Sequence, residues 1–214
     1  MKIIFDLDYT LLDTAKFKEK MADIFDKENF KADYEKYFKN EGINFDCDKY
    51  LAMLKAEGRI DGAREKELRS EVEKLISNID NYLKPDAENV LKHFKAGGAE
   101  LILITFGNKK WQKQKVKNLS IAKYFSNIIF EEKNKHRSEY LKLLSETDEE
   151  ILIINDNISE AEEMLKILKR GELHLVDGPY NKGPYDGNKE VRVNKLAELI
   201  PGKRENNRIE NLRY

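Results

Sequence analysis

The sequence predicts an α/β protein with a Rossmann-like parallel sheet, helices on both faces of that sheet, and an inserted all-helical segment. Two observations support this fold class. Short apolar runs alternate with helical patterns over much of the chain, and this is the order of elements in parallel sheets. After the first apolar run, residues 14–83 instead show apolar positions three and four apart and no strand pattern.

The first strand and its turn are predicted over residues 2–12, where an Ile-Ile-Phe run suits a strand covered on both faces. Asp6 and Asp8 follow this run, so they lie at a strand's carboxyl end, where open α/β sheets bind ligands. Two carboxylates placed there repel each other unless a cation or a shared proton intervenes. A divalent metal is the simplest solution. Ordinary turn chemistry is the alternative, but it does not explain an acid that interrupts an apolar strand.

Residues 14–83 are predicted to form a helical bundle inserted after the first strand. Residues 63–83 fit one long helix whose apolar stripe needs a partner, which the preceding shorter helices supply. Gly42 and Gly58 mark turns between these helices.

From residue 84 onward, helices and strands alternate again. The predicted helices are 84–96, 109–118, 138–145 and 159–170, and the strands are 101–104, 128–130, 151–154 and 173–176. Residues 177–188 are rich in Gly, Pro and Asn and are predicted to form a loop, followed by a short strand and a helix in 191–200. The domains are therefore expected to be a core of residues 1–13 and 84–201, a helical insert of 14–83, and a polar tail of 202–214.

Composition excludes several classes of protein. Charged residues make up 37% of the 214 residues but nearly cancel to a net charge of -1, so no nucleic-acid polymer is expected as a partner. Cys47 is the only cysteine, which rules out an internal disulfide and a thiolate metal site. No apolar run has the length of a signal peptide or of a membrane span. We expect a soluble, cytoplasmic monomer or homodimer without membrane partners.

Polar residues also follow the later strands. Thr105 comes directly after the strand 101–104, and Asp156 follows the strand 151–154, with Glu160 four residues further on. Lys133 and Lys135 lie between the third strand and the next helix. Each of these alone has an ordinary explanation as a strand end, a helix start or a solvated surface charge.

Taken together and in this order, these residues resemble the four motifs of the haloacid dehalogenase superfamily, most of whose members are magnesium-dependent phosphatases. The D-x-D-x-T spacing of Asp6, Asp8 and Thr10 is similar to the first motif. The resemblance implies that Asp6 is the nucleophile, that Asp8 is the general acid/base, and that Thr10 supports the turn. It gives Thr105, in the second motif, a hydrogen bond to the transferring phosphoryl group.

The third and fourth motifs are matched less closely. The third is a lysine, for which we favour Lys135 over Lys133 because it lies nearer the predicted helix start, although Arg137 is also within reach. Asp156 matches the metal-binding acid of the fourth motif. Glu160 matches its second acid, which usually acts through water. Asn155 replaces the usual small or acidic residue.

The resemblance implies a Mg²⁺ site formed by the carboxylates of Asp6 and Asp156 and the backbone carbonyl of Asp8. These oxygen ligands suit Mg²⁺ and leave room for phosphate and water. Residues 14–83 fall where the superfamily places its type-1 helical cap, which would gate entry of the substrate.

The expected function is hydrolysis of a small phosphomonoester, such as a nucleotide or a sugar phosphate, through an aspartyl-phosphate on Asp6. A phosphomutase acting on a sugar phosphate uses the same core and cap and stays an alternative. A non-catalytic binding protein is a further alternative, although such a protein needs no nucleophile. A 2-haloacid dehalogenase is less favoured, because its chemistry needs no metal and would leave Asp8 and Asp156 unexplained.

Overall fold

The computed structural model describes residues 1–181 and 190–201, in which one parallel sheet has the strand order β3-β2-β1-β4-β5-β6. The strands are β1 (Lys2–Phe5), β2 (Glu100–Phe106), β3 (Asn127–Glu131), β4 (Ile151–Asn155), β5 (Gly171–Val176) and β6 (Glu190–Val193). The chain runs outward from β1 through β2 to β3, and then crosses back to β4 on the other side of β1. This reversal beside β1 creates the topological switch point at which α/β sheets bind ligands.

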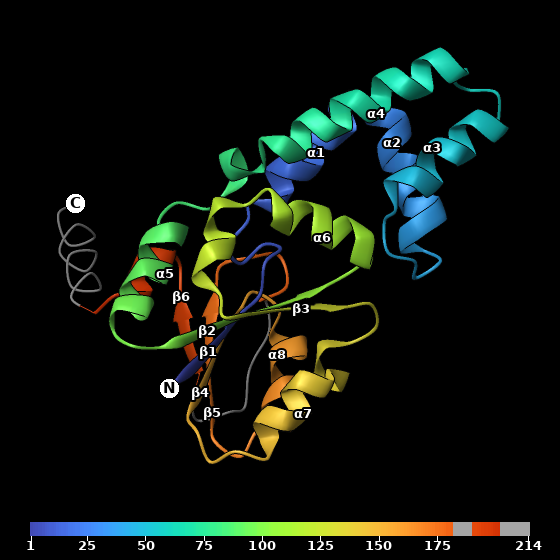
Figure 1. Cartoon of the computed structure of the whole chain (residues 1–214). Coiled ribbons are helices and arrows are strands. Elements are labelled where there is room, and N and C mark those ends of the chain that lie inside the picture. The colour runs from blue at the N-terminus through green and yellow to red at the C-terminus, as the bar shows by residue number, and fades with distance from the viewer. Residues whose placement is uncertain (182–189, 202–214) are drawn as a thin grey trace, which may run out of the picture.

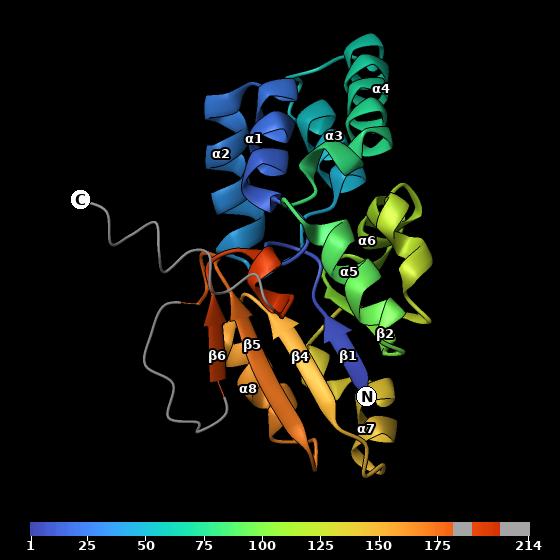
Figure 2. The same ribbon diagram turned by 90° about the vertical axis from the view of Figure 1, so that its left-hand side faces the viewer.

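Helices cover both faces of the sheet (Figure 1), which confirms the predicted fold class. The α-helices are α1 (Thr14–Ile24), α2 (Lys27–Tyr34), α3 (Cys47–Ala56), α4 (Gly62–Ser77), α5 (Ala87–Ala96), α6 (Lys109–Lys117), α7 (Glu139–Ser145) and α8 (Ile158–Leu165). Short helical turns are η1 (Glu35–Lys39), η2 (Ile79–Tyr82), η3 (Ser120–Tyr124), η4 (Lys135–Arg137) and η5 (Leu196–Leu199). Helices α5 and α6 lie on one face, and α7 and α8 lie on the other (Figures 1 and 2).

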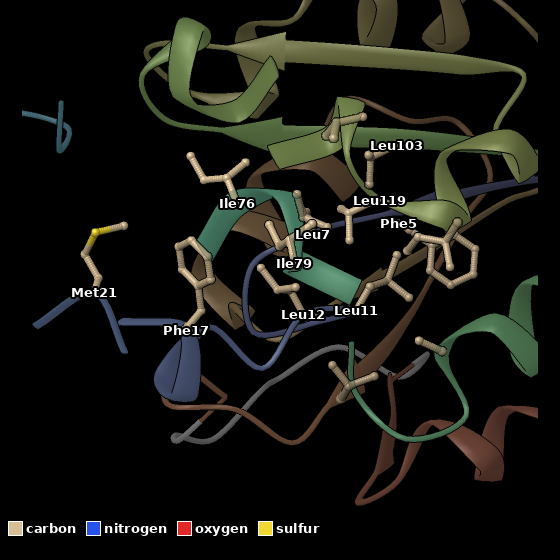
Figure 3. Close-up of a cluster of buried hydrophobic side chains, with 14 of the residues drawn as sticks. Phe5, Leu7, Leu11, Leu12, Phe17, Met21, Ile76, Ile79, Leu103 and Leu119 are labelled. Carbon is tan, nitrogen blue, oxygen red and sulfur yellow. The ribbon is translucent and has the colours of Figure 1, made fainter. Parts of the chain in front are cut away.

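The buried side chains of β1 divide between these two faces. Ile3 and Phe5 pack into one apolar cluster, whereas Ile4 packs into the opposite cluster. This alternation along an apolar run is what a strand between two helical layers requires. The first cluster continues beyond the sheet, where Phe17 of α1 and Ile79 of η2 lie beside the residues that follow β1 (Figure 3).

Helices α1 to α4 lie over the carboxyl ends of the strands (Figure 2). The two chain connections to this helical layer run side by side: the Asp13 amide donates to the Tyr82 carbonyl at 2.7 Å, and the Lys84 amide donates to the Leu11 carbonyl at 2.8 Å. Aspartates cap three of the helices by accepting a backbone N–H bond, Asp13 for α1, Asp46 for α3 and Asp61 for α4. The division into a core of 1–13 and 84–201 and a separate cap of 14–83 stays a prediction.

Two predicted helices are shorter than their apolar patterns suggest. The prediction of one helix over 63–83 was wrong, because α4 ends at Ser77, where both the amide and the side chain of Asn78 bind the Lys74 carbonyl. The helix predicted over 159–170 ends at Leu165. Its N-cap is Asn157, whose side chain accepts the Glu160 amide at 3.2 Å.

The end of the core also differs in detail. Residues 191–200 do contain the expected strand, but the helix after it is the single turn η5. Most of the predicted loop 177–188 and the tail 202–214 lie outside the described residues. No helix in the described part of the chain combines the length and the hydropathy needed to span a membrane.

Candidate active site

Asp6 lies directly after β1 at the switch point, and its backbone amide donates to the Ile154 carbonyl at 3.0 Å. The residue is only 7% exposed. Its carboxylate oxygen Oδ1 lies 2.6 Å from the Lys135 Nζ. Burial raises the pKa of Asp6 to about 6, and the Lys135 ammonium partly opposes this rise. The structure therefore holds the predicted nucleophile in a desolvated position against one cation.

Lys135 connects two carboxylates that are distant in sequence. It sits in η4, is 2% exposed, and lies 2.6 Å from Glu160 Oε2 as well as from Asp6. Burial alone would lower the pKa of Lys135, because it disfavours the charged ammonium. The neighbouring Asp6 and Glu160 carboxylates have the larger combined effect and raise this pKa. Lys133 and Arg137 are exposed to solvent. Of the three cations considered from the sequence, the structure brings Lys135 to Asp6, while its role in catalysis stays a prediction.

Glu160 is thus paired directly with Lys135. Its Oε2 also accepts a hydrogen bond of 3.0 Å from the side-chain amide of Asn155. Asn155 departs from the superfamily pattern, and the structure gives it this positioning contact at the end of β4. The fourth-motif acid is therefore held in place from two sides.

Asp156 follows β4 and is held by Thr10. The Thr10 hydroxyl accepts the Asp156 amide at 3.0 Å and lies 3.4 Å from its Oδ1, so Thr10 joins the two strand ends. The other oxygen, Oδ2, is buried without a hydrogen-bond partner among the described residues. Burial, and then the nearby Asp6 carboxylate, raise the pKa of Asp156 to about 7.

The loop after β5 closes tightly over Asp156. A Cβ atom added at Gly178 would lie 2.7 Å from Asp156 Oδ2, so only glycine fits there without displacing the carboxylate. The Lys84 ammonium donates to the Asp177 carbonyl at 2.7 Å, and burial lowers the pKa of Lys84. The sequence alone indicates no role for this loop, for Gly178 or for Lys84. A lone glycine in a Gly-rich loop carries no signal for such a contact.

Asp8 is bound by partners that the sequence analysis did not identify. Its carboxylate lies 2.7 Å from the Lys115 Nζ and accepts bonds of 2.8 Å each from the Gln112 side-chain amide and the Thr14 hydroxyl. Burial opposes ionisation of Asp8, but Lys115 and these hydrogen bonds lower its pKa to about 2. The spacing of Gln112 and Lys115 on one face of α6 was the only available signal.

Thr105 lies at the end of β2, one strand away from Asp6. Its hydroxyl oxygen is fully buried and has no hydrogen-bond partner among the described residues. A buried hydroxyl without a partner is costly, unless a ligand completes its hydrogen bonding. This position is compatible with the predicted bond to a phosphoryl group.

The predicted metal ligands are compatible with a hard cation. No three His, Cys, Asp or Glu side chains in the described ranges are grouped to hold a metal, since Asp8 turns its carboxylate toward Lys115. The prediction assigned only the backbone carbonyl of Asp8 to the metal. Asp6 and Asp156 supply two buried carboxylates with raised pKa values, and Asp156 Oδ2 lacks a partner. Oxygen donors of this kind match the preference of Mg²⁺.

A cavity of about 810 Å³ opens beside Asp8, between the helical layer and the strand ends. Its wall includes Asp8, Thr14, Gln112 and Lys115, together with many aromatic side chains. Trp111 is one of them, and its ring also packs edge-on against Phe45 with a centroid distance of 5.7 Å.

Many solved structures are similar to the chain. A protein provisionally assigned as β-phosphoglucomutase from Thermotoga maritima is 19% identical, with 96% of this chain and 99% of that chain covered and a TM-score of 0.58. The provisionally assigned HAD hydrolase YfnB from Bacillus subtilis, bound to magnesium, is 17% identical, with coverages of 92% and 96% and a TM-score of 0.56. A dehalogenase is 16% identical, with coverages of 94% and 95% and a TM-score of 0.63. At these identities the likeness shows the fold alone.

The sequence itself matches a family model. No curated protein is similar enough in sequence to count as a relative. The model for haloacid dehalogenase-like hydrolases, however, matches residues 3–167, from β1 into the segment after α8. This range includes Asp6, Thr105, Lys135 and Asp156. The chain therefore belongs to the family of haloacid dehalogenase-like hydrolases.

Proposed function

We propose that the protein is a Mg²⁺-dependent phosphatase that hydrolyses a small phosphomonoester through an aspartyl-phosphate on Asp6. The observation that carries this proposal is the buried Asp6 carboxylate, held 2.6 Å from Lys135 beside the Asp156 carboxylate. Lys135 binds Asp6 Oδ1, which leaves Oδ2 as the attacking atom. Mg²⁺ bound by Asp6, Asp156 and the Asp8 carbonyl would neutralise charge on the phosphoryl oxygens.

The chain's own residues supply the other parts of this reaction. Asp6 Oδ2 forms a bond to phosphorus as the bond from phosphorus to the leaving oxygen breaks. The Thr105 hydroxyl donates to a phosphoryl oxygen, and the Lys135 ammonium offsets negative charge at Asp6. The aspartyl-phosphate is then hydrolysed by water, which releases phosphate and restores the Asp6 carboxylate.

Asp8 would protonate the leaving oxygen in the first step and accept a proton from water in the second. The ion pair with Lys115 holds Asp8 as a carboxylate, which is the form that the second step needs. Proton donation in the first step requires Asp8 to separate from Lys115. Because Thr14 and part of the cavity wall come from α1, movement of the helical layer would alter the contacts of Asp8.

Two of the similar structures, the dehalogenase and the protein provisionally assigned as β-phosphoglucomutase, suggest two alternative reactions. Dehalogenation would leave Asp8 and Asp156 without a function, since that chemistry needs neither a metal nor an acid at Asp8. A mutase would return the phosphoryl group to a bound sugar instead of to water. No described residue favours that outcome over hydrolysis.

The test is release of phosphate from p-nitrophenyl phosphate by the purified chain, in Mg²⁺ and in EDTA. We expect turnover that needs Mg²⁺ and that is lost in Asp6→Asn, a variant that keeps the side-chain shape but not the nucleophile. Hydroxylamine should convert an aspartyl-phosphate on Asp6 to the hydroxamate, with release of phosphate, in the unmodified chain only. Absence of turnover for every phosphomonoester tried in Mg²⁺, or full activity of Asp6→Asn, would refute the proposal.

A further inference from the structure

The cavity beside Asp8 is larger than a phosphoryl group requires. Its volume of about 810 Å³ lies in the range of pockets that enclose a whole metabolite, roughly 300–1,000 Å³. Aromatic rings form much of its wall, including Tyr9, Phe45, Phe106, Trp111 and Tyr180. Aromatic walls suit a planar ring, which packs against them by stacking or edge contacts.

Lys18 of α1 is one of the charged residues in this aromatic wall, which also includes Lys31 of α2. The Lys18 Nζ lies 5.4 Å from the ring centroid of Tyr9 and 5.3 Å from that of Tyr34, close enough for cation–π contacts. No carboxylate within residues 1–181 and 190–201 lies within ion-pair distance of Lys18. An ammonium that lines a cavity and is surrounded by tyrosine side chains rather than carboxylates can accept an anion from a ligand.

The two glutamates that line the same cavity do not pair with Lys18, because each is paired with another lysine. Glu19 is 2.8 Å from Lys27, and Glu35 is 2.7 Å from Lys39. Both lie in the cavity lining and are engaged by lysines of the helical layer. The part of the wall around Lys18 is therefore positive.

Tyr9 lines the cavity with its backbone in an unfavourable conformation. Its φ of 61° is left-handed, a conformation that costs a side chain roughly 1–2 kcal/mol and favours glycine. The ring nevertheless lines the cavity and lies edge-on to Tyr180, with a centroid distance of 5.6 Å. Because Tyr9 directly follows Asp8, this strained turn brings the ring beside the reacting groups.

We propose that the cavity binds the leaving group of the substrate, and that this group has a planar ring carrying a second anionic group. The ring packs between Tyr9 and the other aromatic side chains, and the anion, a carboxylate or a second phosphate, pairs with Lys18. This assignment rests on the proposed phosphatase function. It narrows the substrate class from any small phosphomonoester to one whose leaving group contains a planar ring and a further anionic group.

The first test compares kcat/KM for ethyl phosphate, phenyl phosphate, 4-carboxyphenyl phosphate and 1,4-phenylene bisphosphate. We expect the ring to be preferred over ethyl and either second anion to be preferred over phenyl. Lys18→Met keeps the apolar stem and should lower the ratio of 4-carboxyphenyl to phenyl phosphate by about tenfold, the loss of one charge-assisted contact. The matched control is Lys20→Met on the same helix, whose lysine pairs with Asp23 and does not line the cavity.

The second test measures binding without turnover. Trp111 is the chain's only tryptophan and lines the cavity, so its fluorescence reports on a bound leaving group. We expect 4-hydroxybenzoate to bind more tightly than phenol, and Lys18→Met to remove this difference. Asparagine adopts the left-handed conformation more readily than most residues, so Tyr9→Asn should fold normally, which circular dichroism checks. This variant should bind both 4-hydroxybenzoate and phenol more weakly.

The outcomes separate this proposal from the function on which it rests. Selective, Lys18-dependent binding without hydrolysis of any phosphomonoester would refute the phosphatase and support the cavity assignment. Hydrolysis of all four esters with equal kcat/KM, and ratios unchanged in Lys18→Met, would refute the cavity assignment and leave the phosphatase. A preference for carboxylate over phosphate, or the reverse, identifies which anion Lys18 receives.

Discussion

Replacement of Lys135 by methionine tests the charge balance at the centre of the site. In the native chain its ammonium lies 2.6 Å from both Asp6 and Glu160, and all three side chains are largely buried. Methionine has a similar length but no charge. The variant therefore leaves two carboxylates facing each other without the cation that compensates them.

The burial of this ion pair indicates how much stability the variant should lose. Removing one partner of a buried ion pair typically costs about 3–5 kcal/mol, because the remaining charge stays desolvated. We expect Lys135→Met to lose stability of this order at neutral pH in EDTA. Loss of the charge that we propose stabilises the transition state should also lower kcat by about 100- to 1,000-fold.

The pH dependence of this loss has a definite sign. Lys135 lowers the pKa of Asp6, so its removal should raise that pKa above the native value of about 6. An acid whose pKa is raised in the folded state stabilises the fold at low pH and loses this contribution as pH rises through that pKa. The stability difference between variant and native chain should therefore be larger at pH 8 than at pH 5.

Urea unfolding and steady-state kinetics measure the two effects. Lys133→Met is the matched control, because Lys133 lies two residues away and is exposed, so its loss should change stability by less than about 0.5 kcal/mol. Adding Glu160→Gln to Lys135→Met should recover part of the stability but not the activity. A reversed ranking of the two lysines, or a Lys135→Met chain with native stability and activity, would refute this reasoning.

Three further predictions concern other positions. Asp8→Asn keeps the backbone carbonyl and should retain Mg²⁺ affinity by calorimetry, but lower turnover of an alkyl phosphate about 100- to 10,000-fold; unchanged turnover would exclude Asp8 as acid/base. Gly178→Ala should displace Asp156 and cost about 1–3 kcal/mol in urea unfolding, whereas the control Gly62→Ala meets no atom within 4 Å and should not destabilise the fold; equal effects would contradict the close contact. Burial raises the pKa of the Cys47 thiol to about 12, so native Cys47 should react with a disulfide reagent at pH 8 at least about a hundredfold slower than in urea, and equal rates would show that it is accessible.

The sequence by itself predicted the α/β fold class and the strand ends at which the candidate site residues lie. The apolar run before Asp6 and the later runs before Thr105 and Asp156 are local signals, since a buried strand needs consecutive apolar side chains and parallel strands share one carboxyl edge. The helical periodicity of residues 14–83 was equally local, although it did not reveal that α4 ends at Ser77. There the pattern continues, but the Asn78 side chain binds the Lys74 carbonyl at the helix end, and the turn η2 then leads to Leu83, which pairs with Leu12.

Only the tertiary structure decided which side chains meet. Lys133 and Lys135 are indistinguishable as residue types, and burial between Asp6 and Glu160 singles out Lys135 because η4 directs only that side chain inward. The pairing of Asp8 with Lys115 joins residues 107 positions apart, and no short pattern encodes a contact of that range. The cavity depends in the same way on how the helical layer packs over the strand ends. Such contacts depend on the relative placement of whole elements, which packing of the core fixes and local sequence does not.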